Sequence, residues 1–137
     1  MIFLDTNVVS ETFRKVPNEA VIAWLIRHDA ELALSSIVIG EIAYGIAKIR
    51  DEERAPRLEL SLKDWRSRFV GRIYGFDEEA ALTYGTIMAE AKRRGQPMSA
   101  PDGMIAAVAR TKAGALATRN IDDFRDCGVE LVNPWDF

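Results

Sequence analysis

Short apolar runs alternate along this chain with longer segments whose apolar residues recur at helical spacing. The first run, residues 1–4, is followed by Asp5, Thr6 and Asn7, and the second, residues 32–34, is followed by a pair of serines. Short continuous apolar runs are typical of strands buried on both faces of a parallel sheet, and polar residues directly after them can begin the next helix. The pattern therefore predicts an α/β fold.

The same pattern predicts the order of the elements. We expect strands at residues 1–4, 32–34, 73–76, 115–118 and 129–132. We expect helices at residues 8–13, 18–28, 37–49, 58–71, 77–94 and 101–113, with a charged turn at 50–57 and a turn or helical turn at 120–124. The expected architecture is a three-layer α/β/α sandwich around a parallel sheet of about five short strands. Residues 1–137 are expected to form one domain, because the length suits one and no repeat or linker interrupts it.

Composition excludes several classes of protein. The net charge of −3 gives no sign of nucleic-acid binding, although most of the 18 basic residues are arginine, which can hold phosphate with two hydrogen bonds. The single cysteine, Cys127, excludes an internal disulfide, and no apolar run approaches the roughly 18 residues of a membrane span. We therefore expect a cytoplasmic protein. The only histidine, His28, lies within a predicted helix, which excludes catalysis by a histidine pair.

Acidic residues from four separate segments are expected at one edge of the sheet. Asp5 ends the first strand, Glu41 follows the second, Asp102 begins the helix that leads into the fourth, and Asp122 and Asp123 follow the fourth. Ligands of parallel α/β sheets bind beyond the carboxyl ends of the strands. Clustered carboxylates repel one another unless a cation neutralises them, and carboxylate oxygens suit Mg²⁺ or Mn²⁺. The pattern therefore predicts metal-ion chemistry.

Each acidic residue also has a structural interpretation. Asp5 can cap a helix, Glu41 can be solvated, Asp102 can complement a helix dipole, and only one of Asp122 and Asp123 needs to face the site. If all of these residues had only structural roles, their four segments would meet at one edge of the sheet by chance. Further polar residues expected at the same edge could orient the ligands: Thr6, Asn7, Ser36, Thr118 and Asn120.

Basic and aromatic residues give weaker signals. Three clusters could hold a phosphate backbone, although a solvated helix face is the simpler interpretation of each: Arg50/Arg54/Arg57, Arg66/Arg68/Arg72 and Lys92/Arg93/Arg94. Four aromatic residues fall on apolar faces, where packing in the core or in a dimer is favoured over base stacking: Trp24, Tyr44, Trp65 and Phe69.

Five segments together resemble PIN domains, including VapC-type and FitB-type members. They are FLDTN at 3–7, SSIVIGE at 35–41, PDGMIA at 101–106, ATRNIDDF at 117–124 and VNPW at 132–135. The resemblance covers nearly the whole chain in the family's order and spacing. It implies a PIN-fold endoribonuclease that uses Mg²⁺ or Mn²⁺ and is the toxin of a type II toxin–antitoxin pair. It also implies a homodimer, an RNA substrate, and an antitoxin that inserts a segment into the active-site groove.

The resemblance also implies roles for the acidic residues. Asp5, Glu41 and Asp102 match the family's three main acidic ligands, Asp123 matches the fourth, and Asp122 is the alternative for it. The expected reaction is hydrolysis by metal-activated water, which leaves 5′-phosphate and 3′-hydroxyl ends.

Three other classes of protein are consistent with part of this pattern. A haloacid-dehalogenase-type phosphatase needs a second aspartate where this chain has Asn7. A receiver domain needs a lysine after the fifth strand, where Asn133 and Pro134 stand instead. A PIN-fold module that binds RNA or a protein partner without cutting is the remaining alternative.

Overall fold

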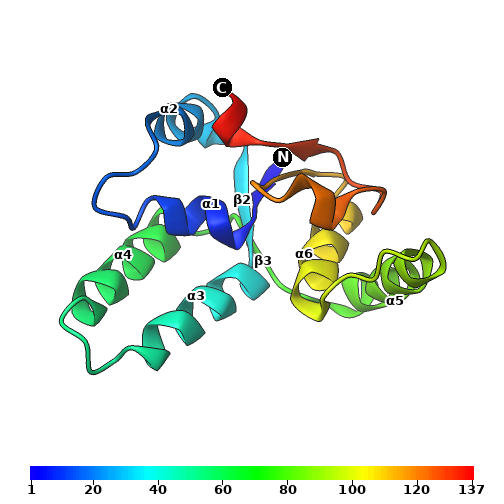
Figure 1. The fold of residues 1–137 in the computed structure, drawn as a ribbon, viewed down its shortest axis with the longest axis horizontal. Coiled ribbons are helices and arrows are strands. Elements are labelled where there is room, and N and C mark those ends of the chain that lie inside the picture. The colour runs from blue at the N-terminus through cyan, green and yellow to red at the C-terminus, as the bar shows by residue number, and fades with distance from the viewer.

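The computed structural model describes residues 1–137 and contains one sheet of five parallel strands (Figure 1). The strands are β1 (Ile2–Leu4), β2 (Leu32–Ser35), β3 (Ile73–Tyr74), β4 (Ala115–Ala117) and β5 (Leu131–Val132). Their order across the sheet is β3-β2-β1-β4-β5. The predicted fold class, a parallel α/β sheet of five short strands, is therefore confirmed.

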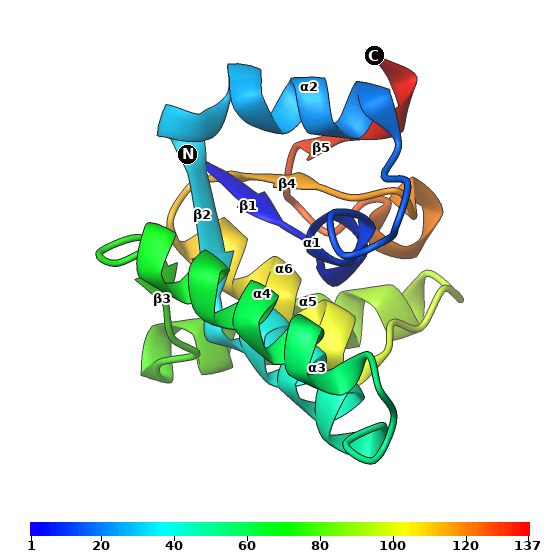
Figure 2. The same ribbon diagram turned by 90° about the vertical axis from the view of Figure 1, so that its left-hand side faces the viewer.

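Six α-helices and three short 3₁₀ helices connect the strands. The α-helices are α1 (Thr6–Glu11), α2 (Glu19–Arg27), α3 (Ser36–Lys48), α4 (Ala55–Arg68), α5 (Glu78–Arg93) and α6 (Ala100–Thr111). The 3₁₀ helices are η1 (Asp29–Glu31), η2 (Ile121–Phe124) and η3 (Pro134–Asp136). Helices α2 and α6 lie on opposite faces of the sheet, and α5 packs outside α6 (Figure 2). None of these helices combines the length and apolar character needed to cross a membrane.

The strand order creates a switch point beside the central strand. After β1 the chain adds β2 and then β3 on one side, and it returns to place β4 and β5 on the other. Leu4 at the end of β1 is paired with Ala117 at the end of β4. Ligand sites in open parallel sheets form at such a point, because the connections after the two strands leave in opposite directions. The residues after Leu4 and Ala117 are therefore the expected start of a site.

The core lies between the sheet and its helices. Phe3 and Leu116 in the central strands are at most 1% exposed, and Trp24 of α2 and Ile105 of α6 are equally buried. Trp24 and Phe69 thus pack in the core as predicted. Tyr44 does not, since it is 67% exposed on α3, so the core interpretation is wrong for Tyr44 and its packing in a dimer stays a prediction.

Several element boundaries differ from the predictions. Helix α1 begins at Thr6 rather than at residue 8, because the Asp5 side chain caps it by accepting a hydrogen bond from the Thr6 N–H. Helix α4 begins at Ala55, inside the segment predicted as a turn, and Pro56 occupies its first turn. Strands β3 and β5 contain only two residues each. Both are edge strands, so each pairs on one side only.

Candidate active site

Asp5 lies where β1 meets α1 and is held at both carboxylate oxygens. The Thr6 N–H donates to Oδ1 at 2.8 Å, and the Thr118 hydroxyl donates to Oδ2 at 2.7 Å. Asp5 is only 5% exposed, so these two bonds replace most of the water that a free carboxylate would bind. They connect the ends of β1 and β4 and fix the orientation of the Asp5 carboxylate.

Glu41 joins this site from α3. The Thr6 hydroxyl donates a 2.6 Å hydrogen bond to Glu41 Oε1. Thr6 therefore contacts two acidic residues at once, Asp5 through its backbone N–H and Glu41 through its side chain. The bond to Glu41 joins the start of α1 to the second turn of α3 at the carboxyl edge of the sheet.

Asp102 lies in the first turn of α6. Ser99 caps this helix by accepting a hydrogen bond from the Asp102 N–H at 3.3 Å. Ser99 was not among the predicted site residues, although the spacing Ser-x-x-Asp before an apolar run is a recognisable helix-start signal. Burial raises the pKa of Asp102 to about 6, with further contributions from the negative charges of Asp5, Asp123 and Glu41.

The neighbouring carboxylates affect the ionisation of Asp5 as well as that of Asp102. Burial raises the pKa of Asp5, the bonds from Thr118 and Thr6 partly oppose this, and the charges of Glu41 and Asp123 raise the pKa further. None of the four acids forms an ion pair with a lysine, an arginine or the histidine. The edge of the sheet therefore carries a concentrated negative charge that the protein itself does not neutralise.

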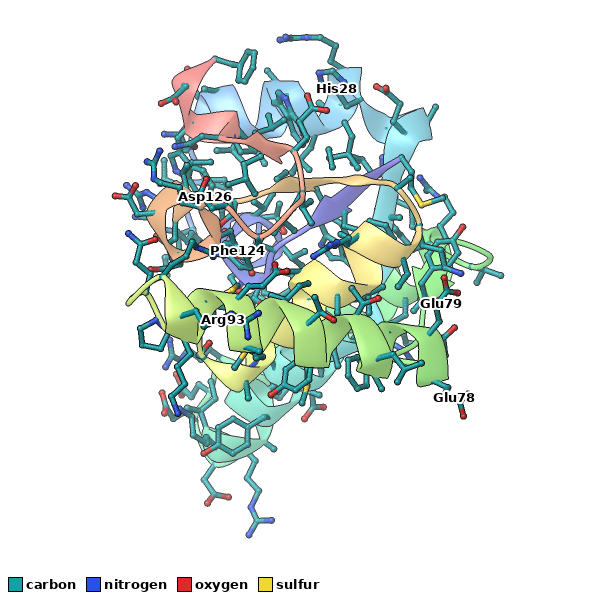
Figure 3. The ribbon with its side chains drawn as sticks, turned by 90° about the vertical axis from the view of Figure 1, so that its right-hand side faces the viewer. His28, Glu78, Glu79, Arg93, Phe124 and Asp126 are labelled. Atoms are coloured by element: carbon teal, nitrogen blue, oxygen red, sulfur yellow. The ribbon has the colours of Figure 1, made fainter.

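Asp122 and Asp123 have different surroundings on η2. Both residues are exposed, but Asp122 pairs with Arg125, whereas the charge of Asp123 raises the pKa of both Asp5 and Asp102. Both residues and Asp102 line an open pocket of about 430 Å³. Phe124, labelled in Figure 3, is the last residue of η2 and is 1% exposed, so it anchors η2 in the core. The ion pair of Asp122 and the charge effect of Asp123 on the other acids thus favour Asp123 as the fourth acid.

The five predicted orienting residues are only partly brought together. Thr6 and Thr118 hold the acids as described, and Thr118 also accepts a 3.0 Å bond from the Asn120 N–H. Asn7 accepts a 3.3 Å bond from the Arg119 N–H, which holds the loop after β4 against α1.

The structure gives the Ser36 side chain no hydrogen bond, and Ser36 is exposed. The buried serine at this position is its neighbour Ser35, whose hydroxyl oxygen accepts a hydrogen bond from the Val38 N–H and so caps α3. Sequence alone did not separate two adjacent serines at a strand end.

The other titratable groups lie apart from the acids or have structural roles. His28 ends α2, where Nδ1 lies 2.8 Å from Glu31 (Figure 3). Arg72 donates to the backbone carbonyls of Asp29 and Leu32, so it ties β3 to the start of β2. No group of three or more acidic, histidine or cysteine side chains is arranged so that it could by itself hold a metal ion.

Thr118→Val tests how strongly the hydroxyl holds Asp5. We expect the free energy of unfolding in EDTA at neutral pH to fall by about 1–3 kcal/mol, because a buried carboxylate oxygen loses its donor. Urea denaturation measures this loss. Thr86→Val, at an exposed position on α5, is the matched control and should change stability by no more than about 0.5 kcal/mol. Equal effects of the two substitutions would contradict the role assigned to Thr118.

Comparisons with known proteins agree with the resemblance noted in the sequence. The family model of the PIN domain matches residues 2–129. VapC ribonuclease Y4jK of Sinorhizobium fredii is 36% identical over 99% of both chains. Toxin FitB of Neisseria gonorrhoeae is 40% identical, over 98% of this chain and 99% of that protein. The crystal structure of FitAcB from Neisseria gonorrhoeae superimposes with a TM-score of 0.93 at 39% identity and covers 100% of both chains.

Proposed function

Because the chain belongs to the PIN domain family, we propose that it is a divalent-metal-dependent endoribonuclease and the toxin of a type II toxin–antitoxin pair. The observation that carries the proposal is the group of four carboxylates without a cationic partner at the switch point of the sheet. The names of two relatives, a ribonuclease and a toxin, support it.

The residues present fit a hydrated divalent cation. Asp5, Glu41, Asp102 and Asp123 would hold it through oxygen atoms, which are the donors that Mg²⁺ and Mn²⁺ prefer. Mg²⁺ usually binds one or two carboxylates and keeps several waters, so it does not need a complete protein ligand set. When bound, the cation would supply charge neutralisation at the phosphate and lower the pKa of a water molecule.

The chain's own residues prepare the site for this chemistry. Thr118 and Thr6 fix the Asp5 carboxylate, so its oxygens need no reorganisation when a ligand binds. The Thr6 hydroxyl also holds Glu41, which comes from α3. Burial raises the pKa of Asp102 to about 6, so a cation would compete with a proton there as the pH falls. Asp123 adds the fourth negative charge from η2.

Further parts of the proposal follow from the same chemistry. Hydrolysis by water does not use the ribose 2′-hydroxyl, so the products would carry 5′-phosphate and 3′-hydroxyl ends. A cognate antitoxin protein would restrain such an activity, and a homodimer is expected. The single buried cysteine fits the reducing cytoplasm. The alternative is a PIN-fold module that binds RNA or a partner without cutting it.

Cleavage of a panel of labelled RNAs by the purified, antitoxin-free protein tests the proposal. We expect cleavage with Mg²⁺ or Mn²⁺ and none with EDTA. A ligation assay should show that the products carry 5′-phosphate and 3′-hydroxyl ends. Products with 2′,3′-cyclic phosphate would contradict hydrolysis by water. Metal binding without cleavage of any RNA would favour the non-catalytic alternative, and absence of metal binding in calorimetry would remove the basis of the proposal.

A further inference from the structure

A groove of about 730 Å³ opens beside the acidic site, between α1, α3 and α4. Helix α3 packs against both of the other helices, and Figure 1 shows the three together on one side of the molecule. Thr6 and Glu41 line this groove and also belong to the acidic site. The groove is therefore continuous with the carboxylates, and its size lies within the range of about 300–1,000 Å³ that is usual for ligand sites.

The groove is strongly basic although the chain as a whole is acidic. Glu41 is the only acidic residue in its lining. Its five basic residues come from the loop after α1, the end of α3, and the N-cap and first turn of α4: Arg14, Lys15, Lys48, Arg54 and Arg57. A chain with a net charge of −3 thus places a local excess of positive charge directly beside its acidic site.

Two of these five cations are neutralised within the protein. Arg14 lies 3.1 Å from the buried carboxylate of Glu11, and Arg54 lies 3.1 Å from the carboxylate of Glu52. These pairs explain the positions of Arg14 and Arg54 without a ligand.

The other three cations have no carboxylate partner. Lys48 lies over the ring of Tyr44 at 5.2 Å, which leaves its charge in place. Arg57 donates to the backbone carbonyl of Phe13 at 3.1 Å, which holds the guanidinium beside the groove without cancelling its charge. No ion pair involves Lys15. The groove therefore presents three uncompensated positive charges.

We propose that this groove binds the backbone of a single RNA strand on one side of the phosphate to be cut, with Lys15, Lys48 and Arg57 contacting its phosphates. A basic groove with an aromatic residue in its wall, here Phe13, is the usual arrangement for binding unpaired strands. The inference rests on the proposed function, because it takes RNA as the substrate. It adds a reason why a polyanion approaches a site that carries four negative charges: the adjacent cations offset the repulsion.

Binding measured without cleavage tests this inference. The probe is a short fluorescent oligouridylate, and its binding is measured by fluorescence anisotropy in EDTA. Every protein compared carries Asp102→Asn, which reduces the repulsion between the acidic site and the RNA. We expect Lys15→Ala/Lys48→Ala to weaken binding at least about tenfold. For this double variant, the slope of log affinity against log salt concentration should be smaller in magnitude by about 1.4, since each contact with a single-stranded phosphate contributes about 0.7.

The matched control removes the same charge elsewhere. Lys63 and Arg66 are exposed on α4 and do not line the groove, so Lys63→Ala/Arg66→Ala should leave the affinity and the salt slope nearly unchanged. Lys15→Arg/Lys48→Arg should restore both values, because the positive charges return. Thermal denaturation of every variant shows that the proteins compared are folded.

Equal losses in the groove variant and the control variant would overturn the inference. Loss of binding to polyglutamate but not to oligouridylate would also overturn it, because the groove would then serve an acidic protein segment. The proposed function is tested separately by cleavage in Mg²⁺. If the wild-type protein cuts RNA but the groove variant binds RNA as well as the control variant does, the RNA-binding role of the groove is refuted. The proposed nuclease activity would then still stand.

Discussion

Asp102→Asn is expected to lower the rate of RNA cleavage at least about 10³-fold, a loss of about 4 kcal/mol of transition-state stabilisation. The substitution keeps the shape of the side chain and the hydrogen bond from the backbone N–H of residue 102 to the Ser99 hydroxyl oxygen. It removes a negative charge that would hold the cation. Single-turnover cleavage with excess protein measures the effect. Asp123→Asn should have an effect of the same kind if Asp123 is the fourth acid.

Asp122→Asn is the matched control for this prediction. It changes the neighbouring residue on the same 3₁₀ turn, and its carboxylate is exposed and paired with Arg125. We expect cleavage to stay within about twofold of wild type, as is usual for surface substitutions. A fully active Asp102→Asn protein would remove Asp102 from the site. A loss in Asp122→Asn with none in Asp123→Asn would exchange the roles of the two neighbours.

The stability of the protein should fall with rising pH in EDTA and become nearly independent of pH in saturating Mg²⁺. In EDTA, the raised pKa of Asp102, about 6 in the folded protein against 3.8 for the unperturbed group, means that the folded state binds the proton more tightly than the unfolded chain does. This contribution to stability is fully present below pH 3.8 and is lost as the pH rises through 6. The raised pKa of Asp5 acts in the same direction. The melting temperature in EDTA should therefore fall between pH 5 and 7 as these groups ionise.

Saturating Mg²⁺ should remove this fall, because the cation replaces the proton on Asp102 and the folded state then binds no more protons than the unfolded chain. Below the pKa of about 6, the apparent affinity for Mg²⁺ should fall about tenfold for each pH unit if one proton is released. The stabilisation by saturating Mg²⁺ should then be largest at neutral pH and weak at pH 5.

Differential scanning fluorimetry in Mg²⁺ and in EDTA across this pH range measures both trends. Asp102→Asn should melt at least as high as wild type in EDTA at neutral pH, because a repelling charge is gone, and should gain much less from Mg²⁺. Parallel pH curves with and without Mg²⁺ would show that the cation does not bind at these carboxylates.

Local signals in the sequence were sufficient to predict the sheet and most of its connections. Residues 1–4 and 32–34 are continuous apolar runs. Strands that are buried on both faces of a parallel sheet need apolar residues at successive positions. Asp77, which caps α5, and Gly95, which closes it with a φ of 75°, are equally local signals. The positions of Asp5, Glu41 and Asp102 relative to their own strands and helices were predicted on the same basis.

Contacts between distant segments were beyond such signals. The hydrogen bond from Thr118 to Asp5 joins residues 113 apart, and the one from Thr6 to Glu41 joins residues 35 apart. Both depend on β1 lying between β2 and β4, which is a property of the assembled sheet. The tertiary structure also distinguishes Asp122 from Asp123. Arg125 pairs with Asp122, whereas the charge of Asp123 acts on the other acids.

The sequence by itself thus determined which residue types stand at the ends of the strands, because secondary structure and burial depend on neighbours along the chain. Only the tertiary structure decided which of those residues meet, which are neutralised and which keep a free charge. The basic groove is the clearest case, because Lys15 of the loop after α1, Lys48 of α3 and Arg57 of α4 are brought together by packing that no local pattern specifies. Electrostatic energy depends on distance in space, and folding sets that distance.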